Sequence, residues 1–348
     1  EQIAALTTSQ FAAMSSAQAQ AMTSSQIPYL GAAGITALAG LSSAGMTALG
    51  IDNVTHLTTD AIAALTEAQI SALATVVDKA LTTSQIKSLG ANLLLSLGTS
   101  VSLFSTDQLK ALTTDQIVSL DATQISALAT DRFQTLTTDK IAALTSSQLL
   151  GLTTVQIGSM TSAQVGSLTT DQIVALRVDQ VNSLGTGQVA GLTTDQIVAL
   201  TTEQVENLGS TQLNALTSTQ LQSIEITDLQ ILTTEQLTAL PTTSVSKLST
   251  DQVAALTTAQ LVSLTTGQFA SLTTAQITSL TAGQENAITT EQIANMTTTQ
   301  IRSLTEDQIR LLTTQQAAAL TGPQVTALSD AQWAVMTGDN AAILRPGT

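Results

Sequence analysis

The sequence predicts an all-α solenoid, a superhelix of very short helices with one helix in each eight-residue repeat. Three observations support this fold class. The repeat keeps a constant length over most of the chain, a helix-start signal recurs in most units, and aromatic residues make up only 2% of the composition. Self-similarity at a short, constant period is typical of architectures in which each unit packs on its neighbours. A core without aromatic side chains must be thin, which suits such a stack.

The repeat is an octad, of which residues 193–200 (TTDQIVAL) are a good example. From residue 105 to residue 344 the chain divides into thirty consecutive octads without an insertion or deletion, and Leu, Met or Ile closes each one. The consensus is Thr-Thr-(Asp/Glu/Ala/Ser)-Gln-(Ile/Val/Leu)-x-(Ala/Ser)-Leu. Residues 105–344 therefore form a regular array, and residues 345–348 are a short tail.

Residues 1–104 carry the same octads less regularly. The register slips at 39–41 and again in the seven-residue unit 98–104. Glycine replaces the usual glutamine at Gly34 and Gly45, and Pro28 stands where it would damage a helix. We therefore expect this region to be bent or less ordered.

A continuous helix is excluded because eight residues overshoot two helical turns by about 80°, so the leucine row would spiral around the helix. A capping box marks the residue at which each new helix starts. In octad 193–200 we expect the Thr193 side chain to accept a hydrogen bond from the Gln196 amide, and the Gln196 side chain to accept one from the Thr193 amide. Leu192 and Ile197 flank it as a hydrophobic staple. Asp195 lies in the first turn, where a carboxylate favours the positive end of the helix.

A helical wheel of one octad places positions one, five and eight within about 60° of arc. Positions two, three and six lie on the opposite side, and position six is often polar, as at Lys110 and Arg302. Position seven is small almost everywhere, which would let neighbouring helices approach closely. The alternative fold is a β-solenoid, because Thr, Ile and Val favour strands. Against it, the Ile and Leu of an octad are one step out of phase with strict alternation.

Composition excludes several function classes. The formal net charge is −15 with only ten Lys and Arg residues, so we expect no nucleic-acid partner. Cysteine is absent, which removes disulfides, thiol catalysis and thiolate-bound metals. Residues 30–51 are long and apolar enough to raise the question of a membrane span. Ser42, Ser43 and the lack of flanking basic residues favour a solenoid there, so a membrane partner is not expected.

Four patterns raise the question of chemistry, and we expect all to be structural. His56 is the only histidine, too few for a usual zinc site. The Ser-x-x-Lys matches at 84–87 and 244–247 lack a Lys-Thr-Gly partner. The glycines in 185–191 do not have phosphate-loop spacing. The aromatic side chains are too scattered for a stacking platform, and four occupy position five as core residues: Phe11, Phe133, Phe269 and Trp333. We expect no enzyme activity, cofactor or metal site.

Two polar rows follow from the repeat. Carboxylates recur at position three, where they serve solubility and the helix N-terminus, with weak calcium binding as the alternative; examples are Asp107, Asp115, Asp131, Asp139, Asp171, Asp179, Asp195, Glu203, Asp251 and Glu291. The Thr-Thr pairs form a second row. Flat threonine ladders can bind ice or polysaccharide, although capping would occupy half of these hydroxyls.

The unit Leu-Thr-Thr-Asp-Gln-Ile at 168–173 is similar to the octapeptide arrays of very large secreted or cell-surface proteins of Gram-negative bacteria. Such proteins are usually regarded as exoproteins or adhesins. The resemblance covers residues 1 to about 344 and implies an extracellular or cell-surface location, but it carries no catalytic or binding residues. Because the chain opens inside a repeat, we expect a fragment of a longer array or a processed form.

These observations predict a non-enzymatic structural repeat protein, an extracellular or cell-surface spacer of the adhesin type. One alternative is a self-assembling filament subunit that stacks through Ala- and Ser-rich faces. Another is a weak glycan-, calcium- or ice-binding module. The expected partners are further copies of the chain or a component of a cell surface or extracellular matrix.

Overall fold

The computed structural model describes residues 5–7, 9–10, 13–23, 25–26 and 41–345. Across these residues the regular structure is helical and no strand occurs. The all-α prediction is therefore confirmed and the β-solenoid alternative is wrong. Pro28, Gly34 and most of the 39–41 slip lie outside the described residues. No helix in the described ranges is both long and apolar enough to cross a membrane.

The chain forms two compact units, Glu1–Ser183 and Leu184–Thr348. The first contains the helices α2 (Ser16–Gln20), α4 (Ser43–Leu49), α5 (Ile51–Thr55), α6 (Thr59–Ala63), α7 (Glu67–Ala72), η3 (Ala74–Val76), α8 (Val77–Ala80), α9 (Thr83–Ser88), α10 (Ala91–Ser96), η4 (Gly98–Leu103), α11 (Thr106–Ala111), α12 (Thr114–Ser119), α13 (Ala122–Ser126), α14 (Thr130–Phe133), α15 (Thr138–Ala143), α16 (Ser146–Gly151), α17 (Thr154–Ser159), α18 (Ser162–Gly166), α19 (Thr170–Ala175) and α20 (Val178–Asn182).

The second unit contains α21 (Thr186–Val189), α22 (Thr194–Val198), α23 (Thr202–Glu206), α24 (Ser210–Ala215), α25 (Ser218–Ser223), α26 (Ile226–Ile231), α27 (Thr234–Thr238), α28 (Thr242–Val245), α29 (Thr250–Ala255), α30 (Thr258–Ser263), α31 (Thr266–Ala270), α32 (Thr274–Thr278), α33 (Ala282–Ala287), α34 (Thr290–Asn295), α35 (Thr298–Ser303), α36 (Glu306–Leu311), α37 (Thr314–Ala318), α38 (Gly322–Ala327), α39 (Asp330–Val335) and α40 (Gly338–Leu344). The thirty helices α11 to α40 match the thirty octads one to one.

Each octad makes a short helix because two of its residues are extended. In α12, position one (Thr113) has ψ 165° and position eight (Leu120) has ψ 144°, so the helix is confined to the residues between them. The predicted capping box is present: the Thr113 amide donates to Gln116 Oε1 at 2.9 Å and the Gln116 amide donates to Thr113 Oγ1 at 3.1 Å. Helices this short are marginal alone, so they depend on packing.

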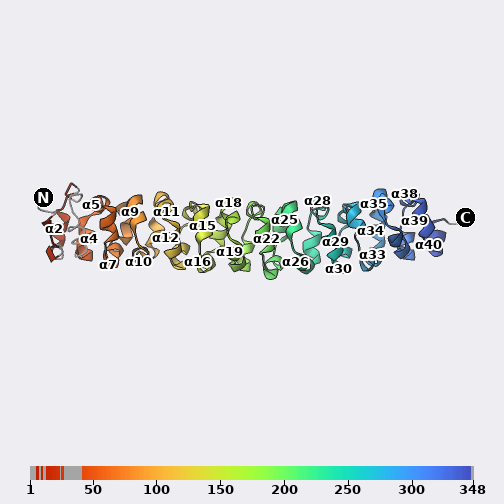
Figure 1. The fold of residues 1–348 in the computed structure, drawn as a ribbon, viewed down its shortest axis with the longest axis horizontal. Helices are drawn as coiled ribbons and strands as arrows, with labels where there is room; N and C mark the ends of the chain where they lie inside the picture. Colours follow the sequence, from red (N-terminus) through yellow and green to blue (C-terminus); the bar gives the residue numbers. More distant parts are fainter. Residues whose placement is uncertain (1–4, 8, 11–12, 24, 27–40, 346–348) are drawn as a thin grey trace. The chain divides into compact units, whose positions relative to one another are not determined.

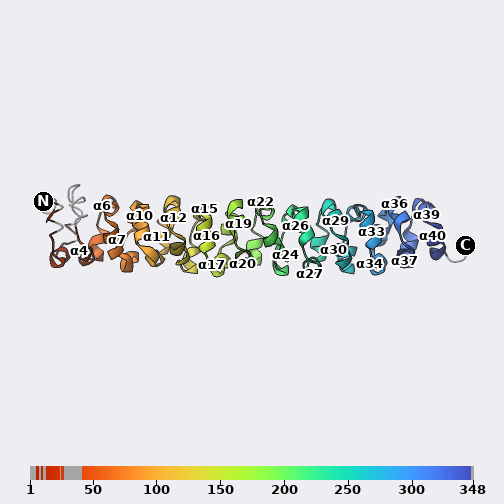
Figure 2. The same cartoon turned by 90° about the horizontal axis from the view of Figure 1, so that it is seen from below.

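The helices coil so that each turn holds between three and four octads. Helices three octads apart pack together, as in α12 with α15 and α16 with α19 in the first unit, and α22 with α25 in the second. Figure 1 shows α15 and α18 along one edge of the first unit and α16 and α19 along the other. Figure 2 shows the same coil from below, with α34 and α37 on one edge of the second unit.

The core lies inside this coil and is made by positions five and eight. Ile117 and Leu120 of α12 are buried, and Phe104, Phe133 and Phe269 are fully buried. Position four is also buried, whereas position one, which the helical wheel placed near the apolar stripe, is exposed. The reason is that the threonine at position one caps its own helix at the surface, while the glutamine at position four points toward the preceding turn.

The buried glutamine joins consecutive turns of the coil. Gln148 Nε2 donates to the carbonyl oxygens of Ile117 and Leu120, both at 2.7 Å. These carbonyls belong to positions five and eight of the octad four units earlier. The last carbonyls of a helix lack intrahelical partners, and a buried carbonyl without a hydrogen bond is costly. One glutamine side chain therefore forms hydrogen bonds both at the start of its own helix and at the end of a helix in the preceding turn of the coil.

The slip at 98–104 is absorbed by a 3-10 helix. Residues Gly98–Leu103 form η4, and Gly98 has a positive φ of 54°. Gln116 consequently reaches carbonyls 30 and 27 residues back, those of Ile86 and Leu89, instead of the 31 and 28 of the regular array. The turn-to-turn hydrogen bonds are thus kept across a missing residue.

Candidate functional site

The outer surface of the array consists mostly of positions one, two, three and six. The position-three carboxylates named above are all exposed. Within the described ranges, no three Asp, Glu or His side chains approach closely enough to hold a metal ion. The carboxylates are therefore arranged as separate charges, each at the start of a helix, where a negative charge is favourable.

The first threonine of most Thr-Thr pairs in the described residues is engaged in capping, Thr137 being an exception, so it is not a free binding hydroxyl. Thr193 Oγ1, for example, accepts from the Gln196 amide at 3.1 Å. Where position one is glycine, the glutamine half of the box remains: the Gly185 amide donates to Gln188 Oε1 at 2.8 Å. The glycines of residues 185–191 thus lie in an ordinary octad, with α21 beginning at Thr186.

The other sequence candidates lie apart from any catalytic arrangement in the described structure. His56 is exposed at the end of α5, and its Nδ1 is 2.6 Å from the Asp52 carbonyl oxygen. Ser84 and Lys87 are both exposed on α9. Ser244 and Lys247 lie at positions four and seven of their octad, and the Lys247 carbonyl accepts from Gln222 Nε2 at 2.7 Å.

The aromatic residues in the described part of the chain are core side chains, with one exception. Phe133 and Phe269 are fully buried at position five, as predicted, and Phe11 lies outside the described residues. Trp333 is only half-buried, and the Arg345 guanidinium lies 3.8 Å from the centre of its ring. The arginine thus covers the exposed face of the indole by a cation–π contact.

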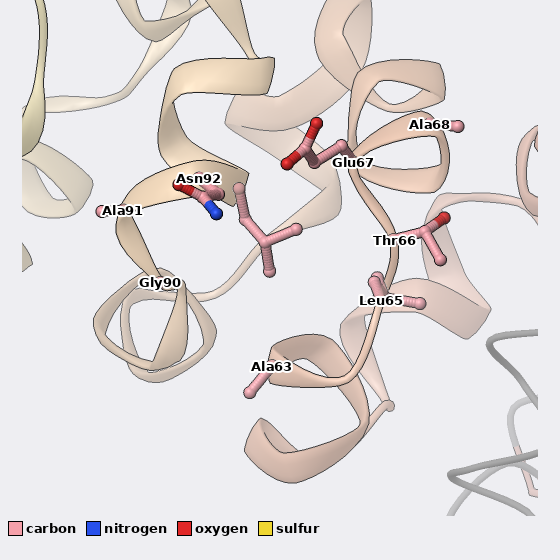
Figure 3. Close-up of a pocket in the computed structure, with 9 residues that line it drawn as sticks. Ala63, Leu65, Thr66, Glu67, Ala68, Gly90, Ala91 and Asn92 are labelled. Atoms are coloured by element: carbon pink, nitrogen blue, oxygen red, sulfur yellow. The ribbon is translucent and has the colours of Figure 1, made fainter.

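An open groove lies between α7 and α10. It has a volume of about 800 Å³ and is lined by Ala63, Leu65, Thr66, Glu67, Ala68, Gly90, Ala91, Asn92 and Leu93. Figure 3 shows Glu67 on one wall and Asn92 on the opposite wall, with both polar ends directed into the space between them. A carboxylate, an amide and apolar walls could accept a small polar ligand.

The groove follows from local sequence. Position one of the α10 octad is Gly90, which has an ordinary φ of −72° and leaves α10 without a side-chain cap. No atom lies within 4 Å of the place where its Cβ would be. Because no threonine side chain fills this place, the space between the two turns stays open.

Basic residues replace the position-four glutamine in two neighbouring octads. Lys140 is buried, and its Nζ donates to the Lys110 carbonyl at 2.7 Å. Burial lowers the pKa of Lys140, nearby Asp139 opposes this shift, and Lys87 adds to it. Arg132 likewise donates to the Ser102 carbonyl. Like the glutamine of other octads, these two side chains donate to backbone carbonyls of the preceding turn, so we interpret them as structural.

Sequence reasoning missed the second role of glutamine, because the capping box alone explained its presence. One signal was available: glutamine persists at Gln188 and Gln212 although position one of both octads is glycine. It also missed Glu285, the one charged residue at position five of the regular array.

Comparison with known proteins supports the repeat assignment. A family model described as the ALTTAQ repeat matches residues 1–32, 141–178, 174–202, 221–258 and 285–322. No curated protein matches the chain. The matches fall in both compact units and share the octad period that the helices follow. The matched segments, just under half of the chain, are therefore similar in sequence to the ALTTAQ repeat.

Proposed function

We propose that this chain is a non-enzymatic structural spacer that acts outside the cell or at its surface, in the manner of an adhesin stalk. The observation that carries this proposal is the repeated turn-to-turn hydrogen bond of the buried glutamine. It recurs with the same donors and acceptors in both units, as at Gln148 and Gln260. A device that joins every turn to the one before it resists extension along the coil.

The surface supports the same proposal. Its charges are sparse, with none in several octads of residues 105–344, and the first threonine of most Thr-Thr pairs is engaged in capping. A net charge of −15 disfavours nucleic acid and anionic lipid and favours solubility. The partner of such a spacer would be a component of the cell surface or extracellular matrix.

Single-molecule stretching tests the mechanical part. The chain has no cysteine, so two introduced cysteines provide unique attachment points. We expect resistance followed by release in steps of whole turns, which would each free about 100 Å of extended chain. A chain that extends smoothly at the lowest forces would contradict the spacer role. Protease treatment of intact source cells tests the location, because an intracellular chain would be protected.

One observation favours the filament alternative. Val118, Leu150 and Val174 are exposed aliphatic residues at position six in the first unit, and Val174 is 49% exposed. They are separated by four and three octads, so they lie on one side of the coil. Sedimentation at rising protein concentration distinguishes the two functions: a spacer stays monomeric, whereas a filament subunit grows, and Val174→Thr with Leu150→Gln would reduce that growth.

A further inference from the structure

Glu285 places a carboxyl group inside the core of the second unit. It stands at position five of the octad 281–288, where the other twenty-nine regular octads have an apolar residue. The residue is only 8% exposed on α33. Burying a carboxylate in apolar surroundings is costly unless the charge is paired, so this substitution needs a physical explanation.

The carboxyl group is only partly satisfied. The Gln308 side-chain amide donates one hydrogen bond to it. The Oε1 atom has no hydrogen-bond partner among the described residues. Glu285 also lines a small cavity of about 20 Å³, together with apolar side chains that include Ile277, Met296 and Leu312. Among the described residues, no Lys or Arg side chain forms an ion pair with this carboxyl group.

The charged groups around α33 do not favour the ionised form. The two helices packed on α33 are α30, which has no charged residue, and α36, which carries Glu306, Asp307 and Arg310. Arg310 is engaged at the surface by Asp307 at 2.7 Å and Glu306 at 3.3 Å. Of the neighbouring helices, α29 adds Asp251 and α34 adds Glu291, while α32 and α37 add no charge. Most of these groups are acidic.

We propose that Glu285 is a proton-binding site: its turn of the coil is stable in acid, when the carboxyl group is protonated, and opens more readily once the carboxyl group ionises. In the neutral form the group needs no counter-charge. In the ionised form its charge is surrounded by an apolar cavity and a single amide donor. Opening this turn to water, which solvates the charge, then becomes favourable. A solenoid can open locally because each unit depends mainly on its neighbours. The inference is independent of the spacer function.

The direction of the pH dependence follows from the direction in which the pKa of Glu285 is shifted. Burial raises the pKa of Glu285 above its ordinary value, Asp307 adds to the rise, and the Gln308 hydrogen bond opposes it. A carboxyl group that holds its proton more tightly in the folded state stabilises that state below its unfolded pKa. This contribution is lost as pH rises from the unfolded pKa to the folded pKa, and it stays lost above the folded value.

The test compares two isosteric variants across pH. Glu285→Gln removes the buried proton site, and Glu291→Gln removes an exposed carboxylate at position three of the next octad. Melting temperatures are measured from about pH 3 to about pH 8, on either side of the ordinary glutamate range. We expect the wild type and Glu291→Gln to lose about 2–4 °C relative to Glu285→Gln as the pH rises. An unchanged difference would overturn the proposal.

Two further measurements guard against a folding defect. Carboxyl carbon chemical shifts in the wild-type chain follow the titration of Glu285 directly, and we expect its pKa above the ordinary glutamate value. Titration at or below the ordinary glutamate value would contradict the inference. Glu285→Ile restores the usual core residue, so we expect it to raise the melting temperature and abolish the extra pH dependence. A Glu285→Ile chain that keeps the wild-type pH dependence would also sink the proposal.

Discussion

Octads 42–97 and octads 105–344 share a period but differ in how well their turns are joined. In the regular array, position four is glutamine in all octads except those with Arg132, Lys140, Asp228, Ser244 and Asn340. In octads 42–97 it is glutamine only at Gln69 and Gln85. Octads 42–97 and the seven-residue unit 98–104 that follows them contain both 3-10 helices of the described structure and its positive-φ residues, Gly50 and Gly98.

The difference shows that the octad length alone does not make a regular coil. Leu, Met or Ile closes the octads of both regions, and position five is apolar in both except at Asp78 and Glu285, so burial is similar. What the earlier octads often lack is a side chain that meets the carbonyls of the preceding turn. Asn53 replaces this function in part, donating to the Met22 carbonyl at 2.6 Å. Uniform geometry therefore depends on a buried polar contact.

The largest effect is expected when a regular octad loses its glutamine. Gln316 accepts from the Thr313 amide at 2.9 Å and donates to the carbonyls of Glu285 and Ile288 at 2.8 and 2.9 Å. Gln316→Met keeps the volume but removes these hydrogen bonds, and the Glu285 carbonyl keeps only the one from the Ile288 amide at 3.2 Å. We therefore expect a loss of about 3 kcal/mol in unfolding free energy. Urea denaturation followed by circular dichroism, with hydrogen exchange of the same amides, measures it.

The same octad supplies the control. Gln315 is exposed at position three, so Gln315→Met should change stability by less than about 0.5 kcal/mol. Equal losses in the two variants would show that the buried contacts do not distinguish the regular array from octads 42–97.

A smaller effect is expected at the glycine that links α4 and α5. Gly50 has φ 84° and ψ 158°, a conformation almost restricted to glycine, whereas Gly90 has an ordinary φ of −72°. Neither place for a Cβ has an atom within 4 Å, so only the backbone differs. Gly50→Ala should cost about 2 kcal/mol. Gly90→Ala should stabilise by about 0.5 kcal/mol, and thermal melts of both variants check the contrast.

Much of this structure could be predicted because its signals are local. The capping box, the break after Leu120 and the burial of Ile117 all follow from residues within one octad. The number of octads per turn could not be predicted, since it depends on which distant carbonyl a glutamine reaches. The groove beside Gly90 was missed for the same reason. Glu67 and Asn92 belong to different octads, and only the coiling of the chain brings them to the same groove.

The smallest effect is expected at the threonine half of the capping box. Thr257 Oγ1 accepts from the Gln260 amide at 3.2 Å near the surface, where water can replace it. We expect Thr257→Ala to lower the unfolding free energy by about 1 kcal/mol. Thr258→Ala, at the exposed first helical position, should lower it by less than about 0.5 kcal/mol. Urea denaturation of both variants measures this difference. If Thr257→Ala cost as much as Gln316→Met, helix initiation rather than turn-to-turn bonding would dominate the stability of the regular array.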